Sequence, residues 1–153
     1  MALNKAQFKE LIEETLEEIG LCSTDAVNLL LGTAAQESGF GTYIEQLGNG
    51  PALGVFQMEP NTFKDHIANY LKYKKGLISK IKQSSNVDFF TPGLLKYNLK
   101  FAICMARIHY LRVPSAIPTD LSGYAKYWKD YYNTYLGAGT EEEFIHNYKK
   151  HVL

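Results

Sequence analysis

The sequence has little cysteine and no excess of charge of either sign. Cys22 and Cys104 are the two cysteines among 153 residues, both with apolar neighbours, and no Cys-x-x-Cys pair occurs. Two cysteines are too few for a disulfide-rich secreted domain. We therefore expect two buried free thiols and synthesis in a reducing compartment. Lysine plus arginine and aspartate plus glutamate number 16 each, giving zero formal net charge. A neutral chain gives no electrostatic reason to expect nucleic acid or an anionic membrane as partner.

Long apolar runs and several catalytic motifs are missing as well. Residues 1–6 lack the apolar run of a signal peptide, and no later stretch could span a bilayer. We therefore expect synthesis in the cytoplasm and no membrane span. The four histidines are scattered, and no Gly-x-Ser-x-Gly or Walker sequence occurs. These absences argue against zinc, serine-hydrolase and nucleotide chemistry, and we expect neither a metal nor a cofactor.

What the chain does contain is a mainly helical pattern. Its length, with 46% apolar and 21% charged residues, fits one domain with one core over residues 1–153. Apolar residues at helical spacing predict about six to eight helices. The range 94–113 is apolar on nearly every side, which predicts a buried central helix. Helix starts are predicted at Asn4, at Ser23-Thr24-Asp25, at Asn61 or Thr62, at Thr119 or Asp120, and at Thr140.

Two other segments are distinctive. Residues 39–60 are rich in glycine, and Gly48-Asn49-Gly50-Pro51 is a strong turn signal, which predicts a small β-hairpin. After residue 119, aromatic residues share one helical face, which suits either core packing or stacking on sugar rings. That face consists of Tyr124, Tyr127, Trp128, Tyr131 and Tyr135.

Glu37 is a carboxylate on an apolar stripe. It comes three residues after Ala34 and seven after Leu30, so it continues their helix face. Gly39 and Gly41 predict that the helix ends there, which puts Glu37 in the last turn. Burial and the negative helix end both raise a carboxyl pKa, so we expect Glu37 to hold a proton near neutral pH, as a general acid must. The alternative is a partly buried glutamate whose carboxyl reaches water at the helix end.

Four short segments resemble one family. Glu37-Ser38 and Gly54-Val55-Phe56-Gln57-Met58-Glu59-Pro60-Asn61-Thr62 are similar to the Glu-Ser and Gly-Leu-Met-Gln-x-x-Pro-x-Thr elements of soluble lytic transglycosylases, which have the goose-type lysozyme fold. Tyr110-Leu111 and Tyr132-Asn133 are similar to that family's Tyr-Leu and Ala-Tyr-Asn-Ala-Gly elements, and the order agrees. Residues 50–60 also resemble lysozyme-like proteins of tailed bacteriophages. Phe56, Tyr131 and Thr134 depart from the family pattern.

The resemblance implies a lysozyme-like α+β fold with the hairpin at a cleft. It also implies cleavage of the MurNAc–GlcNAc β-1,4 bond of peptidoglycan, with a 1,6-anhydro-MurNAc product. By resemblance Glu37 acts as acid and then as base, Gln57 lines the floor of the cleft, and Tyr132 helps to hold the glutamate. Ser38 and Asn133 match motif positions that are expected to bind substrate, although Ser38 would serve either to pack or to contact substrate. A monomer made in a bacterial host would reach the wall after holin-type release, or inside the virion.

Two alternatives stay open. Glu45 follows Glu37 by eight residues, close to where phage-type lysozymes place a second carboxylate, so the enzyme could be a hydrolytic muramidase. The other alternative is a virion or wall-binding protein that has the fold without turnover. In each case the expected partner is the glycan strand of peptidoglycan.

Overall fold

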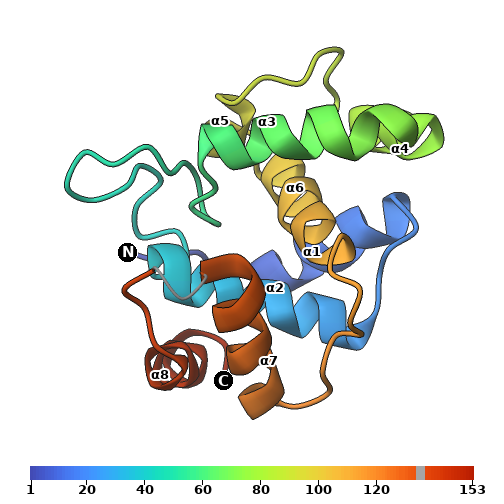
Figure 1. Cartoon of the computed structure of the whole chain (residues 1–153). Coiled ribbons are helices and arrows are strands. Elements are labelled where there is room, and N and C mark those ends of the chain that lie inside the picture. The colour runs from blue at the N-terminus through green and yellow to red at the C-terminus, as the bar shows by residue number, and fades with distance from the viewer. Residues whose placement is uncertain (134–136) are drawn as a thin grey trace.

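The computed structural model describes residues 1–133 and 137–153, and these residues are mainly helical, as predicted. Figure 1 shows the arrangement. The helices are α1 (Lys5–Glu18), α2 (Thr24–Ser38), α3 (Pro60–Asn69), η1 (Leu71–Tyr73), α4 (Lys75–Ser85), α5 (Leu94–Tyr97), α6 (Leu99–Leu111), α7 (Leu121–Trp128), η2 (Lys129–Asn133) and α8 (Glu141–His151). Of these, η1 is a 3-10 helix and η2 is a π-helical turn.

The predicted helix starts are confirmed at four positions. Asn4, Ser23, Asp120 and Thr140 each accept a hydrogen bond from the backbone N–H three residues later, which satisfies a donor that the first helical turn leaves free. The start of α3 differs, because Pro60 occupies its first turn and Glu59 is the cap. Proline suits that position because its fixed φ is helical and it has no N–H to satisfy.

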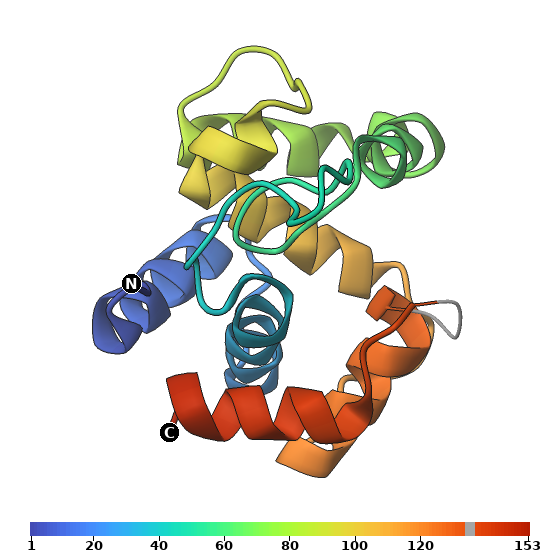
Figure 2. The ribbon, with the colours of Figure 1, turned by 90° about the vertical axis from the view of Figure 1, so that its left-hand side faces the viewer.

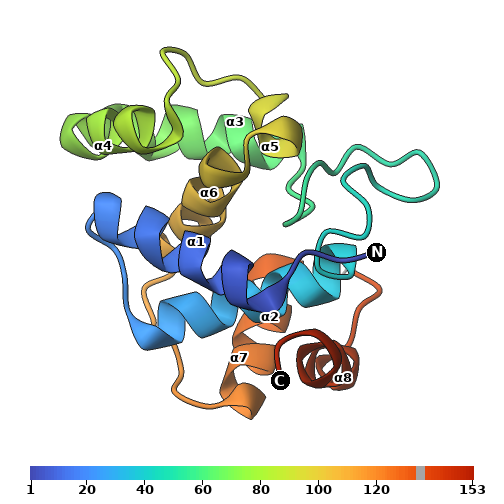
Figure 3. The ribbon, with the colours of Figure 1, turned by 180° about the vertical axis from the view of Figure 1, so that it is seen from behind.

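The predicted central helix over residues 94–113 is in fact two helices. Asn98 separates α5 from α6 in an extended conformation, and its side chain accepts a hydrogen bond from Phe101 N at 2.9 Å. The prediction of a buried helix holds for α6, in which Phe101 and Ile108 have no exposed surface. Seen from behind in Figure 3, α6 crosses the molecule, and it contacts α1 to α5 and η2.

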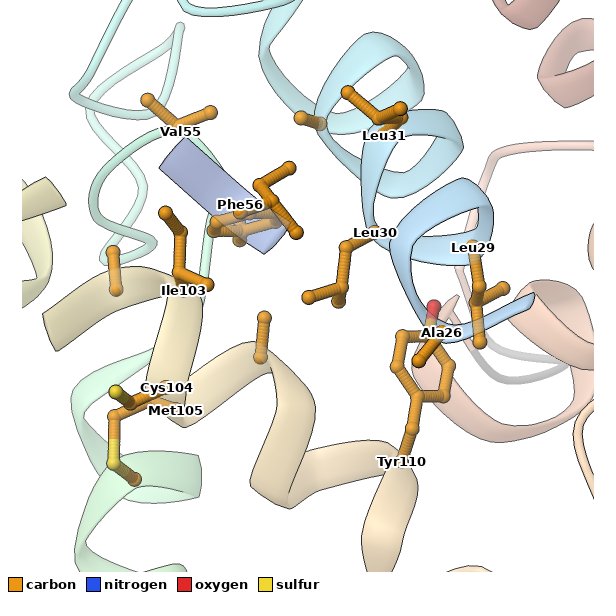
Figure 4. Packing of buried hydrophobic residues seen from close by; sticks show 14 of the residues in the cluster. Ala26, Leu29, Leu30, Leu31, Val55, Phe56, Ile103, Cys104, Met105 and Tyr110 are labelled. Atoms are coloured by element: carbon orange, nitrogen blue, oxygen red, sulfur yellow. The ribbon is translucent and has the colours of Figure 1, made fainter. Parts of the chain in front are cut away.

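The other helices divide between the two sides of α6. Helices α2, α7 and α8 pack against one another on one side, and on the other side η1 contacts both α3 and α4. Figure 2 shows the segment between α2 and α3 crossing from one group to the other. Its Phe56 reaches the core, where Figure 4 shows it between Leu30 of α2 and Ile103 of α6. All three side chains are at most 2% exposed.

The β-hairpin prediction is wrong for this segment, all of which the structure describes. Residues 40–59 form only two isolated bridges, Glu45 with Leu53 and Leu53 with Met58. Leu53 exchanges hydrogen bonds of 3.0 and 3.1 Å with Met58, while Gly54 N donates to Ile44 O at 2.7 Å. The chain thus folds back twice within a few residues, so no pair of segments runs together long enough to form strands.

Other expectations concern thiols, membranes and the aromatic helix. Cys104 is buried as predicted, but Cys22 is exposed in the connection between α1 and α2, and both are free thiols. Across residues 1–133 and 137–153, no helix is long and apolar enough to cross a bilayer. The aromatic helix ends at Trp128 and continues as η2. Thr134 and Tyr135 lie outside the described residues.

Candidate active site

An open cleft of about 680 Å³ lies where the two groups of helices face each other. It brings together side chains from α2, the 39–60 segment, α6 and η2. Four of the predicted site residues line it, although up to 96 positions separate them along the chain. The lining residues used below are Glu37, Tyr43, Gln57, Glu59, His109, Tyr132 and Asn133.

Glu37 lies in the last turn of α2, as its place on the apolar stripe predicts. One carboxyl oxygen, Oε2, accepts a hydrogen bond of 2.9 Å from the indole Nε1 of Trp128. The backbone carbonyl of Glu37 accepts a second, also 2.9 Å, from the Tyr43 hydroxyl. Burial raises the pKa of Glu37 to about 7, and the hydrogen bond from Trp128 acts in the opposite direction. The carboxyl therefore populates both protonation states near neutral pH, so it can give up a proton and take one back.

We expect Trp128 to report this titration directly. It is the only tryptophan, it has no exposed surface, and its indole touches the carboxyl. Because a carboxylate accepts a stronger hydrogen bond than a carboxylic acid, tryptophan emission should change with a midpoint at about pH 7. Fluorescence spectra between pH 4 and 9 measure this step. It should vanish in Glu37→Gln and remain in Glu59→Gln, and an unchanged step in Glu37→Gln would contradict the assignment.

Gln57 forms part of the cleft floor in an unusual backbone conformation. Its φ is 49°, in the left-handed region that side chains other than glycine and asparagine seldom adopt. Its side-chain Nε2 and its backbone N donate to Gly54 O at 3.0 and 3.1 Å, which closes a tight turn. Non-glycine residues held in this region cluster at functional sites.

Tyr132 has a different partner from the one that the resemblance implies. Its hydroxyl donates to the backbone carbonyl of Phe56 at 2.6 Å, so it holds the turn before Gln57. The side chain that bonds the Glu37 carboxyl is Trp128 instead. Tyr132 nevertheless lies near Glu37, whose charge adds to burial in raising the Tyr132 pKa.

Asn133 belongs to a wall that one lysine holds together. Lys129 Nζ donates to Asn133 Oδ1 at 2.8 Å, to Gly137 O at 3.1 Å and to Gly139 O at 2.6 Å. An ammonium group has three N–H bonds, so these contacts use all of them. The side-chain NH₂ of Asn133 is the end of the amide that Lys129 leaves available to a ligand in the cleft.

Two predicted site residues do not line the cleft. Ser38 is fully buried, and its hydroxyl donates to Ala34 O at 3.2 Å and accepts from Gly41 N at 2.9 Å, so it shapes the end of α2. Glu45 is exposed and pairs with Lys96 Nζ at 2.7 Å, and this hydrogen bond lowers the Glu45 pKa. The structure therefore gives Ser38 a structural role and pairs Glu45 with Lys96 outside the cleft lining.

Three residues of the site are absent from the sequence-based set. Trp128 belongs to the aromatic face of α7, and nothing in its local pattern distinguishes it from its buried neighbours. Glu59 follows the Gln57-Met58 pair and lines the cleft. His109 lines the cleft as well, but it is one of six polar residues in the range 94–113, so no signal in the sequence singles it out.

Residues 1–133 and 137–153 contain no group of three or more histidine, cysteine, aspartate or glutamate side chains that could hold a metal ion. Comparison of the chain with protein-family models, with curated proteins and with solved structures found no match. The functional assignment therefore depends on the motifs and on the geometry of the cleft.

Proposed function

We propose that this protein cleaves the β-1,4 bond between MurNAc and GlcNAc in peptidoglycan, as a lytic transglycosylase. The observation that carries the proposal is the Glu37 carboxyl, partly buried at the wall of an open cleft, with its pKa raised to about 7. Gln57, Tyr132 and Asn133, which match the resemblance by sequence, line the same cleft. A groove of about 680 Å³ with both polar and aromatic lining suits a sugar chain.

The proposed reaction uses Glu37 twice. Protonated Glu37 gives its proton to the glycosidic oxygen as the bond to MurNAc C1 breaks, and the acetamido oxygen of MurNAc bonds to C1. The Glu37 carboxylate then takes the proton of the MurNAc 6-hydroxyl, whose oxygen replaces the acetamido oxygen at C1. The product is a 1,6-anhydro sugar, no water is consumed, and Glu37 ends protonated. A pKa near 7 suits both steps, because acid and base forms are similar in energy.

Hydrolysis is the second candidate function, and the structure favours Glu59 over Glu45 as its second carboxylate. Glu59 is the other carboxylate that lines the cleft, and it caps α3 without a side-chain hydrogen bond to the helix. A carboxylate facing the acid across a sugar-binding cleft can position water for direct attack at C1. Glu45 is less suited to this role because Lys96 occupies its carboxylate.

Product analysis of three proteins separates these candidates. We expect wild type to release muropeptides that end in anhydro-MurNAc, which are lighter by one water per cut than hydrolytic products. Glu59→Gln should leave that product unchanged, and Glu45→Gln is the matched control on the same segment. Mass spectrometry of digested peptidoglycan, with and without borohydride reduction, measures this. Fully reducible products that disappear in Glu59→Gln would establish the hydrolase, and wall binding without cleavage by wild type would favour a non-catalytic protein.

A further inference from the structure

Two histidines, His109 in the cleft wall and the buried His66, form a continuous chain of hydrogen bonds with their neighbours. His66 of α3 is 3% exposed, and its Nε2 lies 2.9 Å from Nδ1 of His109 in α6. The other nitrogen of His109, Nε2, lies 2.7 Å from the backbone carbonyl of Tyr131 in η2. The other nitrogen of His66, Nδ1, lies 2.9 Å from NH1 of Arg112.

The two ends of this chain fix the position of every proton in it. Arg112 has only donors, so it must donate to His66 Nδ1, which leaves the His66 proton on Nε2. That proton points at His109 Nδ1, which must accept it, so the His109 proton is on Nε2. A carbonyl only accepts, and His109 therefore donates to Tyr131 O. Both imidazoles are neutral in this arrangement, and each is present as its Nε2–H tautomer.

We propose that His109 is a positioning residue for the cleft. By donating to Tyr131 O, it holds the η2 turn so that the next two residues, Tyr132 and Asn133, face the substrate. The inference rests on the proposed function for its effect on catalysis, but the hydrogen-bond chain is a property of the fold alone. His109 also packs against the Tyr132 ring, with centroids 4.7 Å apart, so the backbone and the side chain of the turn are located by one imidazole.

This hydrogen-bond chain has no place for an extra proton. A proton added to His109 Nδ1 would face the N–H of His66. If His66 responded by moving its own proton to Nδ1, that N–H would face the N–H of Arg112. Either way two donors meet, and the hydrogen bond between His66 and His109 or the one between Arg112 and His66 is lost. His109 keeps its Nε2–H for Tyr131 O but loses the support that fixes its ring, so acid should let the imidazole, and the η2 turn that it holds, shift.

The charged groups around the pair act in both directions. Burial lowers the pKa of His66 to about 3, with His109 and Arg112 acting in the same sense and Asp65 opposing them. Burial also lowers the pKa of His109, whereas its hydrogen bond to Tyr131 O raises that pKa. Of the charged neighbours, Arg112 lowers the His109 pKa and Asp65 raises it. Asp65 is exposed and accepts from Arg112 NH1 at 2.8 Å, so it orients the arginine at the start of the chain.

The test compares His109→Gln with His109→Leu. The Gln amide can donate to Tyr131 O and accept from His66, and unlike imidazole it has no titratable group. We expect His109→Leu to clear cell walls roughly 10- to 100-fold more slowly than wild type at pH 7, since displacement of a positioning group by about 1 Å has effects of that size. We expect the wild-type rate to decline in acid. His109→Gln should regain most of the wild-type rate at pH 7 and should show no such decline. His146→Gln, an exposed histidine on α8, is the control and should keep the wild-type pH profile.

Two readouts keep the test independent of the enzyme assignment. Nitrogen-15 NMR of the histidine side chains should show both His66 and His109 as neutral Nε2–H tautomers at pH 7. Amide hydrogen exchange in residues 131–133 should be faster in His109→Leu than in wild type, and not in His109→Gln. An Nδ1–H tautomer at His109, or an acid decline that persists in His109→Gln, would overturn the proposal. If the NMR pattern holds while wild type cleaves no wall, the proposed function fails and the positioning of η2 by His109 stands.

Discussion

Replacing Glu37 with glutamine should slow the clearing of bacterial cell walls by roughly 100- to 10,000-fold, the usual contribution of one general acid. Glutamine keeps the shape of the side chain and can still accept the hydrogen bond from Trp128, so the fold should persist. Turbidity assays on purified walls measure the rate, and circular dichroism checks the fold. Glu45→Gln is the matched control and should lower the rate only modestly. Clearing by Glu37→Gln at a rate near that of wild type would exclude Glu37 as the acid.

The same substitution should make the protein more stable in alkali. Because the Glu37 pKa is about 7 when folded and 4.5 in its ordinary state, the folded protein binds more protons than the unfolded chain between these values. The free energy of unfolding therefore falls as pH rises from about 4.5 to about 7. This loss is about 3 kcal/mol at pH 8, and glutamine avoids it.

Urea unfolding at pH 4 and pH 8 measures this effect. Wild type and Glu37→Gln should be equally stable at pH 4, and the variant should be the more stable at pH 8. Equal stability at both pH values would mean that the carboxyl is not buried as described. This result does not depend on any enzymatic activity, so it tests the site even if no wall is cleaved.

Replacing Gly54 with alanine should cost more than about 3 kcal/mol, which places it among the most damaging single changes in the chain. Its φ of +81° already disfavours a side chain, and an added Cβ would overlap the backbone carbonyl oxygen of Leu95 in α5. A backbone carbonyl cannot rotate away as a side chain can. Gly54 O also accepts both hydrogen bonds from Gln57, so we expect wall clearing to fall with stability. Urea unfolding and turbidity assays measure the two effects.

Gly48 provides the control for Gly54. It has the same φ of +81°, but no atom lies within 4 Å of the position of its Cβ. Gly48→Ala therefore carries only the cost of the left-handed conformation, about 1–2 kcal/mol. The difference between the two variants measures the contact with Leu95. Equal losses would show that the 39–60 segment does not pack against α5 as tightly as described.

The helix starts could be predicted because the signals for them are local. Asn4, Ser23, Asp120 and Thr140 each bond a backbone N–H three residues away, so the sequence contains both partners. The division between α5 and α6 was missed because Asn98 stands among apolar residues that would suit one long helix. The hairpin prediction failed because a local signal was not enough. Its turn signal was local, but the path of the segment depends on distant contacts such as that of Gly54 with Leu95.

The residues of the candidate site likewise fall into two groups, those that local patterns predict and those that only distant contacts bring in. The helical stripe identifies Glu37, but its hydrogen-bond partner Trp128 is 91 residues further along the chain. Glu45 was a candidate because of its spacing from Glu37, but it pairs with Lys96, 51 residues away, and does not line the cleft. Short-range patterns locate a candidate acid, whereas tertiary contacts decide which neighbours tune it.

The backbone at Gln57 bears on how this protein would respond to selection. A side chain at φ 49° destabilises the folded state by about 1–3 kcal/mol, and glycine at this position would remove most of that penalty. Glycine would also remove the amide from the cleft floor. Random mutagenesis screened for heat resistance alone should thus enrich glycine or asparagine at position 57, whereas screening for cell-wall clearing, the proposed activity, should retain glutamine. Stability and the proposed activity are therefore expected to favour different residues at this one position.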